Sequence, residues 1–139
     1  MYAAIRLRGN IGLSHEDHKT LASLRLTRAN HCVLLKEDKT NEGMLKRVGQ
    51  YITFGKINEA TLNLLVAKRG RLPGDKRIAK ADAQKMAKDL FKGNLDVPIK
   101  RVFRLSPPSK GLRSARKFFP QGDLGNRGEK INELLERMV

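Results

Sequence analysis

Two short stretches of the chain carry side chains suited to binding phosphate groups. Residues 100–119 contain seven Lys and Arg and no Asp or Glu, and residues 68–77 contain five Lys and Arg against one Asp. Together these stretches hold +11 of the formal net charge of +15. Arginine binds phosphate through a planar fork of two hydrogen bonds, and lysine acts as a point charge. A surface that serves only solubility mixes both signs, so the clustering predicts a polyanionic partner, most commonly nucleic acid.

The basic side chains lie on irregular segments and strand ends rather than on one helix. The sequence has no helix-turn-helix, zinc-finger, basic-zipper or aromatic-sheet motif. This arrangement favours a folded RNA, which is recognised by its shape and by the positions of its phosphates. The candidate RNA-binding residues are Arg6, Arg8, Arg25, Arg28, His31, Arg69, Arg71, Lys76, Arg77, Arg101, Arg104, Lys110, Arg113, Arg116, Lys117, Phe118 and Phe119.

The segment RLSPPSKGLRSARKFF, from Arg104 to Phe119, makes up most of the longer basic stretch. Pro107 and Pro108 keep part of it extended, which reduces the conformational entropy lost when it docks. We expect the segment to be flexible in the free protein and ordered on RNA. Phe118 and Phe119 have two alternative roles, stacking on bases or anchoring the end of the loop to the core, and the sequence leaves both open.

The sequence lacks the residue sets that catalysis or metal binding requires. His15 and His18 are three residues apart at a predicted helix start, but no third metal ligand is evident near them. His31 and Cys32 are consecutive on a predicted strand, so their side chains point to opposite faces and cannot form a nucleophile–base pair. We therefore interpret Cys32 as a small core residue. The sequence predicts no enzyme activity, no metal, no cofactor and no small-molecule substrate.

Two glycine-rich stretches resemble phosphate-binding motifs only superficially. GRLPG lacks the spacing and the Gly-Lys-Ser/Thr ending of a phosphate loop. GDLGNRG lacks the close glycine pair of a dinucleotide fingerprint and follows no predicted strand. Its plainest role is to turn the backbone before the last helix, and the alternative is that its backbone N–H groups approach a phosphate.

Bulk features exclude several other classes of protein. The sequence has no apolar run of about twenty residues, no apolar N-terminal signal segment and one cysteine. We therefore expect a protein of a reducing compartment, the cytoplasm, with no membrane partner. A chain of 139 residues with 40% hydrophobic residues is sufficient for one domain with a core.

The opening segment alternates apolar and basic residues. Ala3, Ile5 and Leu7 share one face of a predicted strand, and Arg6 and Arg8 share the other. Two further strands are predicted at CVLL and YITFGKI, with helices between them, so residues 1–57 form a β-α-β-α-β core. Residues 58–139 form an extension with helices and basic loops, and we treat 1–139 as a single domain.

Local signals place the ends of the helices. Ser14 resembles an N-cap with Asp17 three residues on, and Asn41 is the expected N-cap of the second helix. Asn58 begins a third helix, which Gly70 ends. Later elements are a helix with an apolar stripe from Ala83 to Phe91, a short strand at RVFRL and a final amphipathic helix from Ile131 to Met138.

The stretch TLASLRLTRANHCV, followed after ten residues by MLKRVGQYI, resembles the signature of the large-subunit ribosomal protein L-thirty family. GRLPG, VFRLSPP and GDLGNRG-EKINELL resemble its longer archaeal and eukaryotic branch, so the resemblance covers nearly the whole chain. The signature pattern uses twelve positions: Thr20, Leu21, Leu24, Leu26, Arg28, His31, Val33, Met44, Leu45, Val48, Tyr51 and Ile52.

The resemblance implies an α+β fold, in which the β-α-β-α-β core carries a three-stranded antiparallel sheet and is partly ferredoxin-like. The residues alone favour parallel pairing, which strand–helix–strand units usually adopt. The resemblance also implies a structural constituent of the large ribosomal subunit in the cytoplasm, bound to ribosomal RNA, with neighbouring ribosomal proteins as possible partners.

Two departures from the family pattern lead to expectations of their own. The chain starts directly on its first predicted strand, which favours an archaeal source, and its 70–100 region is shorter than we expect of archaeal members. The alternative hypothesis is a free-standing regulatory RNA- or DNA-binding module.

Overall fold

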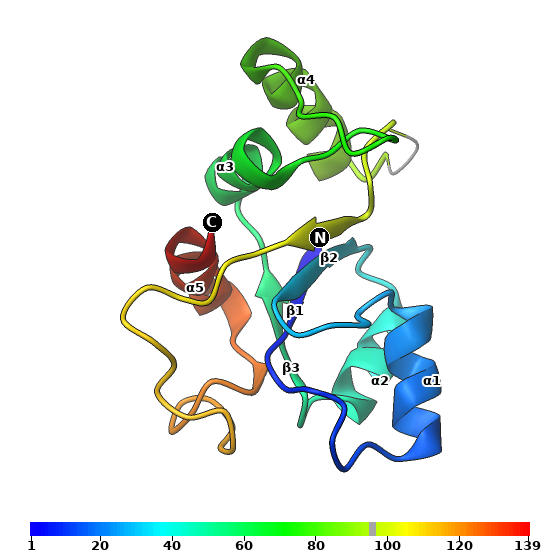
Figure 1. Cartoon of the computed structure of the whole chain (residues 1–139), viewed down its shortest axis with the longest axis vertical. Coiled ribbons are helices and arrows are strands. Elements are labelled where there is room, and N and C mark those ends of the chain that lie inside the picture. Colours follow the sequence, from blue (N-terminus) through cyan, green and yellow to red (C-terminus); the bar gives the residue numbers. More distant parts are fainter. Residues whose placement is uncertain (95–96) are drawn as a thin grey trace.

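The computed structural model describes residues 1–94 and 97–139 and shows a mixed α+β fold (Figure 1). Helices lie on both sides of a central sheet, and a long loop runs from the fourth strand to the fifth. The elements in chain order are β1 (Tyr2–Arg6), α1 (His15–Ser23), β2 (His31–Leu35), α2 (Lys39–Arg47), β3 (Ile52–Lys56), α3 (Glu59–Arg69), α4 (Lys80–Phe91), β4 (Val102–Arg104), β5 (Gly125–Asn126), a 3-10 turn (Gly128–Lys130) and α5 (Ile131–Met138).

The strands form a sheet with the order β4-β2-β1-β3-β5 within the described residues. β1 pairs antiparallel with β2 and with β3, as the family resemblance implied and contrary to the parallel default. The three core strands are confirmed, and the sheet has two more, because the extension contributes β4, the strand predicted at RVFRL, antiparallel to β2, and β5, parallel to β3. The sheet is therefore built from both the predicted core and the predicted extension.

Hydrophobic side chains pack against both faces of the sheet. On one face, Ala4, Val33 and Phe54 pack with the apolar side chains of α1 and α2. On the other face, Ala3 and Ile5 pack with those of α3, α4 and α5. Successive residues of a strand point to opposite faces of the sheet. Because both faces are covered, β1 must present apolar or fully hydrogen-bonded side chains to both faces.

Most of the predicted helix ends are confirmed. Ser14 caps α1, and its side chain accepts a hydrogen bond from the Asp17 backbone N–H at 3.2 Å. Asn58 and Gly70 flank α3 as predicted. The prediction for Asn41 is wrong, because the N-cap of α2 is Asp38, three residues earlier, and the Asn41 side chain instead donates to the Lys36 carbonyl at 3.1 Å.

A close backbone approach brings the last loop onto the sheet. A Cβ atom on Gly55, in β3, would lie 2.0 Å from the carbonyl oxygen of Gly128. Only a glycine permits this contact, which places the turn before α5 directly against β3. The side chain of Asn132, in α5, also ties this region to the end of β3. It accepts a hydrogen bond from the Asn58 backbone N–H at 2.9 Å and donates one to the Lys56 carbonyl at 3.2 Å.

Candidate nucleic-acid interface

Three segments that lie far apart in the sequence meet beside β4 and form a cleft of about 380 Å³. They are the loop before β2 with the first residue of β2, the end of α3 with the GRLPGDKR loop, and the strand β4 with the residues just before it. We call this hollow the basic cleft; its lining residues are Thr27, His31, Arg69, Arg71, Asp75, Lys100, Val102 and Arg104. Among these described residues, four Lys and Arg side chains face one carboxylate, which leaves a surplus of positive charge.

Several of the cleft side chains are held in place by hydrogen bonds. The Arg69 guanidinium donates to the Ser106 hydroxyl, and Arg71 Nη1 donates to the Asp75 carbonyl oxygen at 3.3 Å. Lys100 Nζ donates to Asp75 Oδ1 at 2.6 Å. A preorganised group of cations loses less conformational entropy when it binds an anion.

His31 contributes hydrogen-bonding capacity rather than charge. Burial lowers its pKa below the ordinary value, and the nearby cations Arg104, Arg28 and Arg6 lower it further. A histidine with a lowered pKa is neutral at pH 7, so one ring nitrogen donates and the other accepts. Its Nδ1 atom is buried and has no partner among the described residues.

A second hollow, of about 290 Å³, lies between the end of α1, strand β2 and the residue before β4. Its charged lining residues are Arg25, Lys36, Asp38 and Arg101. Arg25 has a positive φ of 59° at the end of α1, which turns the chain towards β2. The predicted candidates Arg28, Lys76 and Arg77 are also exposed, so the basic surface around the β4 edge extends beyond the cleft.

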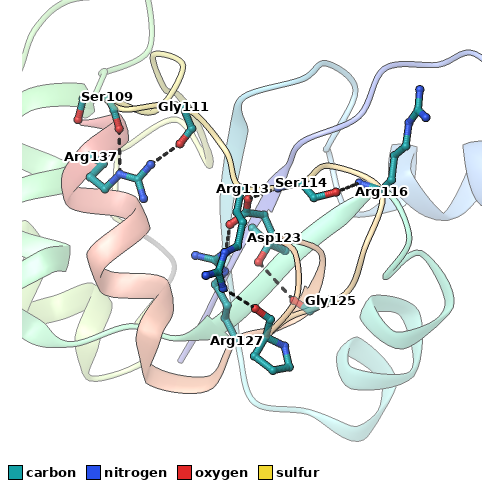
Figure 2. Close-up of polar contacts among 11 residues, drawn as sticks. Ser109, Gly111, Arg113, Ser114, Arg116, Asp123, Gly125, Arg127 and Arg137 are labelled. Atoms are coloured by element: carbon teal, nitrogen blue, oxygen red, sulfur yellow. Dashed lines mark hydrogen bonds and ion pairs between the residues drawn. The ribbon is translucent and has the colours of Figure 1, made fainter.

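The segment 105–124, which we call the C-terminal basic loop, is tied to the rest of the fold at several points (Figure 2). The Ser106 and Ser109 backbone N–H groups donate to carbonyls of Met138 and Arg137 at 3.0 and 2.9 Å. The Arg137 guanidinium donates back to the carbonyls of Ser109 and Gly111. This geometry argues against the flexible loop expected from the sequence, because both termini of the loop and its middle are anchored.

Asp123 is the main organiser of the far half of this loop. Its Oδ2 atom accepts from the Ser114 backbone N–H at 3.0 Å, and its own backbone N–H donates to the Ser114 carbonyl at 2.9 Å. Its other carboxylate oxygen pairs with the Arg127 guanidinium, and both side chains are over 90% buried. Figure 2 shows Asp123 between Ser114 and Arg127, while the Arg116 side chain extends away from the loop.

The exposed cations of the C-terminal basic loop are Lys110, Arg113, Arg116 and Lys117. Arg113 Nη1 donates to the Pro120 carbonyl at 3.2 Å, and the Arg116 backbone N–H donates to Ser114 Oγ at 3.3 Å. These contacts leave most guanidinium and ammonium donors open to solvent. The loop therefore presents cations on a fixed backbone.

Phe118 and Phe119 have different environments. Phe118 is 57% exposed and lies over Gly125, where an added Cβ would come within 2.8 Å of its ring. The Phe119 ring is half-buried, with Arg127 Cζ 5.3 Å and Lys130 Nζ 5.5 Å from its centroid. This geometry favours anchoring for Phe119, and it leaves a large part of the Phe118 ring available for stacking.

Arg6 does not lie on an exposed face, contrary to its predicted position. Its side chain is 1% exposed, because α1, α2 and the loops beside them cover the face that the alternation left open. Its donors are used on the carbonyls of Arg8, Leu26, Thr27 and Gly9 and on the Asn10 side chain. Arg8 is half-buried, and its Cζ lies 5.4 Å from the centroid of the Tyr51 ring.

Asp123 allows a direct test of how the C-terminal basic loop is held. We expect Asp123→Ala to lower the free energy of unfolding by about 3 kcal/mol, because it leaves the Arg127 charge buried and unpaired. Chemical denaturation measures this loss, and hydrogen exchange should show the Ser114 amide losing protection. Asp123→Asn, which keeps an acceptor for Ser114, is the control and should restore that protection. Unchanged stability and unchanged Ser114 protection in Asp123→Ala would contradict this account.

Sequence reasoning missed the acidic residues that shape the basic surfaces. Asp75 was counted only as one opposing charge, and GDLGNRG, which includes Asp123, was interpreted as a turn, whereas it also contains β5 and the Asp123–Arg127 pair. Asp123 and Arg127 are four residues apart, but they lie outside any predicted helix, so the sequence did not indicate that they form a pair. The interpretation of Cys32 as a core residue is confirmed, because its side chain is fully buried in the core, and this burial raises the pKa of its thiol to about 12.

In the part of the chain that the structure describes, no group of three or more His, Cys, Asp and Glu side chains is placed to bind a metal ion. Among residues 1–94 and 97–139, no helix combines the length and the apolar character needed to cross a bilayer.

Comparison with known proteins identifies the relatives of this chain. The family "Ribosomal protein L30p/L7e" matches residues 2–52. Proteins named "Large ribosomal subunit protein uL30" from Methanococcus maripaludis and Methanosphaera stadtmanae are each 40% identical over 152 aligned residues, covering 99% and 100% of both chains. The protein of that name from Archaeoglobus fulgidus is 36% identical over 151 residues, covering 99% of both chains. The chain therefore belongs to the L30p/L7e family of ribosomal proteins.

Proposed function

We propose that this protein is a structural constituent of the large ribosomal subunit in the cytoplasm, where it binds ribosomal RNA through its basic surfaces. The observation that carries the proposal is the basic cleft, in which three distant segments bring cations together around one hollow. The relatives named as large-subunit proteins, aligned over nearly their whole length, support the same assignment. Neighbouring ribosomal proteins are further partners in this proposal.

The arrangement of the basic surfaces fits a protein that holds two RNA segments. The basic cleft lies at the β4 edge of the sheet, where the C-terminal basic loop also begins, and the far half of that loop, with Arg113, Arg116 and Lys117, leads to β5 at the opposite edge. Four inter-strand steps separate these edges, a distance of about 19 Å. Charges that far apart are largely screened from each other at physiological salt, where the Debye length is about 8 Å. The basic cleft and the far half of the loop therefore bind phosphates independently.

The proposed RNA contacts are the exposed or half-exposed members of the predicted set. Arg6 is left out, because its donors are used inside the fold. Phe118 is retained for stacking, and Phe119 is assigned to anchoring the loop. The contacts are Arg8, Arg25, Arg28, His31, Arg69, Arg71, Lys76, Arg77, Arg101, Arg104, Lys110, Arg113, Arg116, Lys117 and Phe118.

A salt titration tests whether phosphate contacts dominate binding. We expect the affinity for deproteinised large-subunit ribosomal RNA to fall by about 10³–10⁵ between 50 and 200 mM salt if six to ten phosphates are contacted. Filter binding at several salt concentrations measures the slope. An affinity that does not change with salt would contradict the mechanism.

Sedimentation separates the ribosomal proposal from a free-standing regulatory module, which shares the electrostatics but not the assembly. We expect the protein in large-subunit fractions of a cell extract. Recovery entirely outside those fractions would favour the regulatory alternative.

A further inference from the structure

Among the described residues that line the basic cleft, one carboxylate, that of Asp75, lies among the cations. Its Oδ1 atom accepts from Lys100 Nζ at 2.6 Å, and its Oδ2 atom lies 3.6 Å from Arg104 Nη1. Arg71 reaches the backbone of the same residue, since its Nη1 donates to the Asp75 carbonyl at 3.3 Å. Two oxygens of one anionic group thus face cations from the β4 side of the cleft, as the oxygens of a bound phosphate would.

The GRLPGDKR loop is folded so that it presents this carboxylate. The Asp75 backbone N–H donates to the Leu72 carbonyl at 3.0 Å, which closes a turn with Pro73 and Gly74 at its centre. The φ of Gly74 is +85°, as the third position of a type II turn requires. Asp75 itself has a φ of +65°, a conformation that Asp and Asn tolerate better than most residues.

The loop is also tied to the segment that carries its cationic partners. Arg71 and Arg77 form an antiparallel bridge across the turn, and the Lys100 backbone N–H donates to the Arg71 carbonyl at 2.8 Å. The position of Asp75 relative to Lys100 is therefore set by backbone contacts and not only by the ion pair. An exchange of anions at this position does not require the loop to unfold.

The ion pairs of Asp75 are accessible to a competing anion. The side chains of Lys100, Asp75 and Arg104 are 40%, 52% and 74% exposed. The hydrogen bond from Lys100 lowers the pKa of Asp75, and the charges of Lys100, Arg104 and Arg71 act in the same direction, so the carboxylate is ionised at neutral pH. Exposed ion pairs are weak, because water solvates both partners and salt screens them.

We propose that Asp75 is an internal substitute for a phosphate group: it pairs with the basic cleft in the free protein and is displaced by an RNA phosphate when the cleft binds RNA. The inference rests on the proposed function and deepens it. An isolated phosphate must compete with a tethered carboxylate, whereas an RNA segment that contacts several cations at once displaces it. Asp75 thereby selects a continuous RNA backbone over small phosphate-bearing molecules.

The test compares the affinity of Asp75→Asn and wild-type full-length protein for deproteinised large-subunit ribosomal RNA at about 0.1 M salt. We expect Asp75→Asn to bind about tenfold more tightly, the effect of one additional effective cation at that salt concentration. Asn suits the positive φ and keeps an oxygen for Lys100, so the loop retains its conformation. The control is Glu59→Gln, which changes the net charge equally at the other end of α3, about 15 Å from Arg69.

A second comparison, made in a protein that already carries two substitutions, shows whether the gain in RNA affinity arises in the cleft. In a protein that already carries Lys100→Ala and Arg104→Ala, adding Asp75→Asn should change RNA affinity by less than about twofold. An affinity of Asp75→Asn equal to or weaker than wild type, or an equal gain in Glu59→Gln, would overturn the inference while leaving the proposed function standing. Wild-type protein that fails to bind this RNA at all would overturn both.

Discussion

Replacing Arg113, Arg116 and Lys117 together with Ala is expected to weaken binding to deproteinised large-subunit ribosomal RNA by about 10²–10³-fold at about 0.1 M salt. Each lost phosphate contact removes about one unit from the salt slope, and at that concentration one unit corresponds to about tenfold in affinity. The slope itself should therefore decrease by about two to three. A filter-binding titration over several salt concentrations measures both quantities.

The same variant should leave the melting temperature nearly unchanged. All three side chains are exposed, and the one loop contact among them is the exposed hydrogen bond from Arg113 to the Pro120 carbonyl at 3.2 Å, whereas the buried anchor is Asp123 and the C-terminal tie is Arg137. The matched control replaces Lys19, Lys39 and Lys88, three exposed cations on α1, α2 and α4, and removes the same total charge. Equal weakening in the control would show a general charge effect, and unfolding of the loop variant would show that the segment is structural.

Replacing Arg6 with Met is expected to lower the free energy of unfolding by about 4 kcal/mol. Met fills much of the volume of the Arg stem, so the loss reports the hydrogen bonds rather than a large cavity. Arg6 donates to the carbonyls of Leu26 and Thr27 at 2.8 and 2.9 Å, and to those of Arg8 and Gly9 at 2.8 and 3.0 Å. Without the guanidinium these carbonyls lose their partner, and a buried unsatisfied acceptor costs about 1–3 kcal/mol.

Urea denaturation of two single variants, Arg6→Met and Arg8→Met, separates the loss of the buried hydrogen bonds from the loss of one positive charge. Arg8 makes one hydrogen bond, to the Gln50 carbonyl at 3.2 Å, and a contact with the Tyr51 ring, so its replacement should cost about 1 kcal/mol. Equal stability of the two variants would contradict the role assigned to Arg6. Because Leu26 and Thr27 lie between Arg25 and Arg28, Arg6→Met should also disorder the loop that carries these two candidate contacts.

Local features of the sequence were sufficient to predict much of the fold. The caps at Ser14 and Asn58, the end of α3 at Gly70 and the amphipathic α5 follow from residues within one or two helical turns of each other. Alternation in the first strand correctly indicated a strand. It did not indicate that both faces are covered, because burial of the second face depends on α1 and α2, which lie elsewhere in the chain.

The charge excess, its clustering into two stretches and the family resemblance were determined by the sequence alone, because they depend only on residue types and spacing. The tertiary structure decided which cations are available and which anions stand among them. It buried Arg6, paired Asp123 with Arg127, added β4 and β5 to the sheet and set Asp75 in the basic cleft. Hydrogen bonds and ion pairs act over a few ångströms in space, so residues distant in the chain become partners only after the chain has folded.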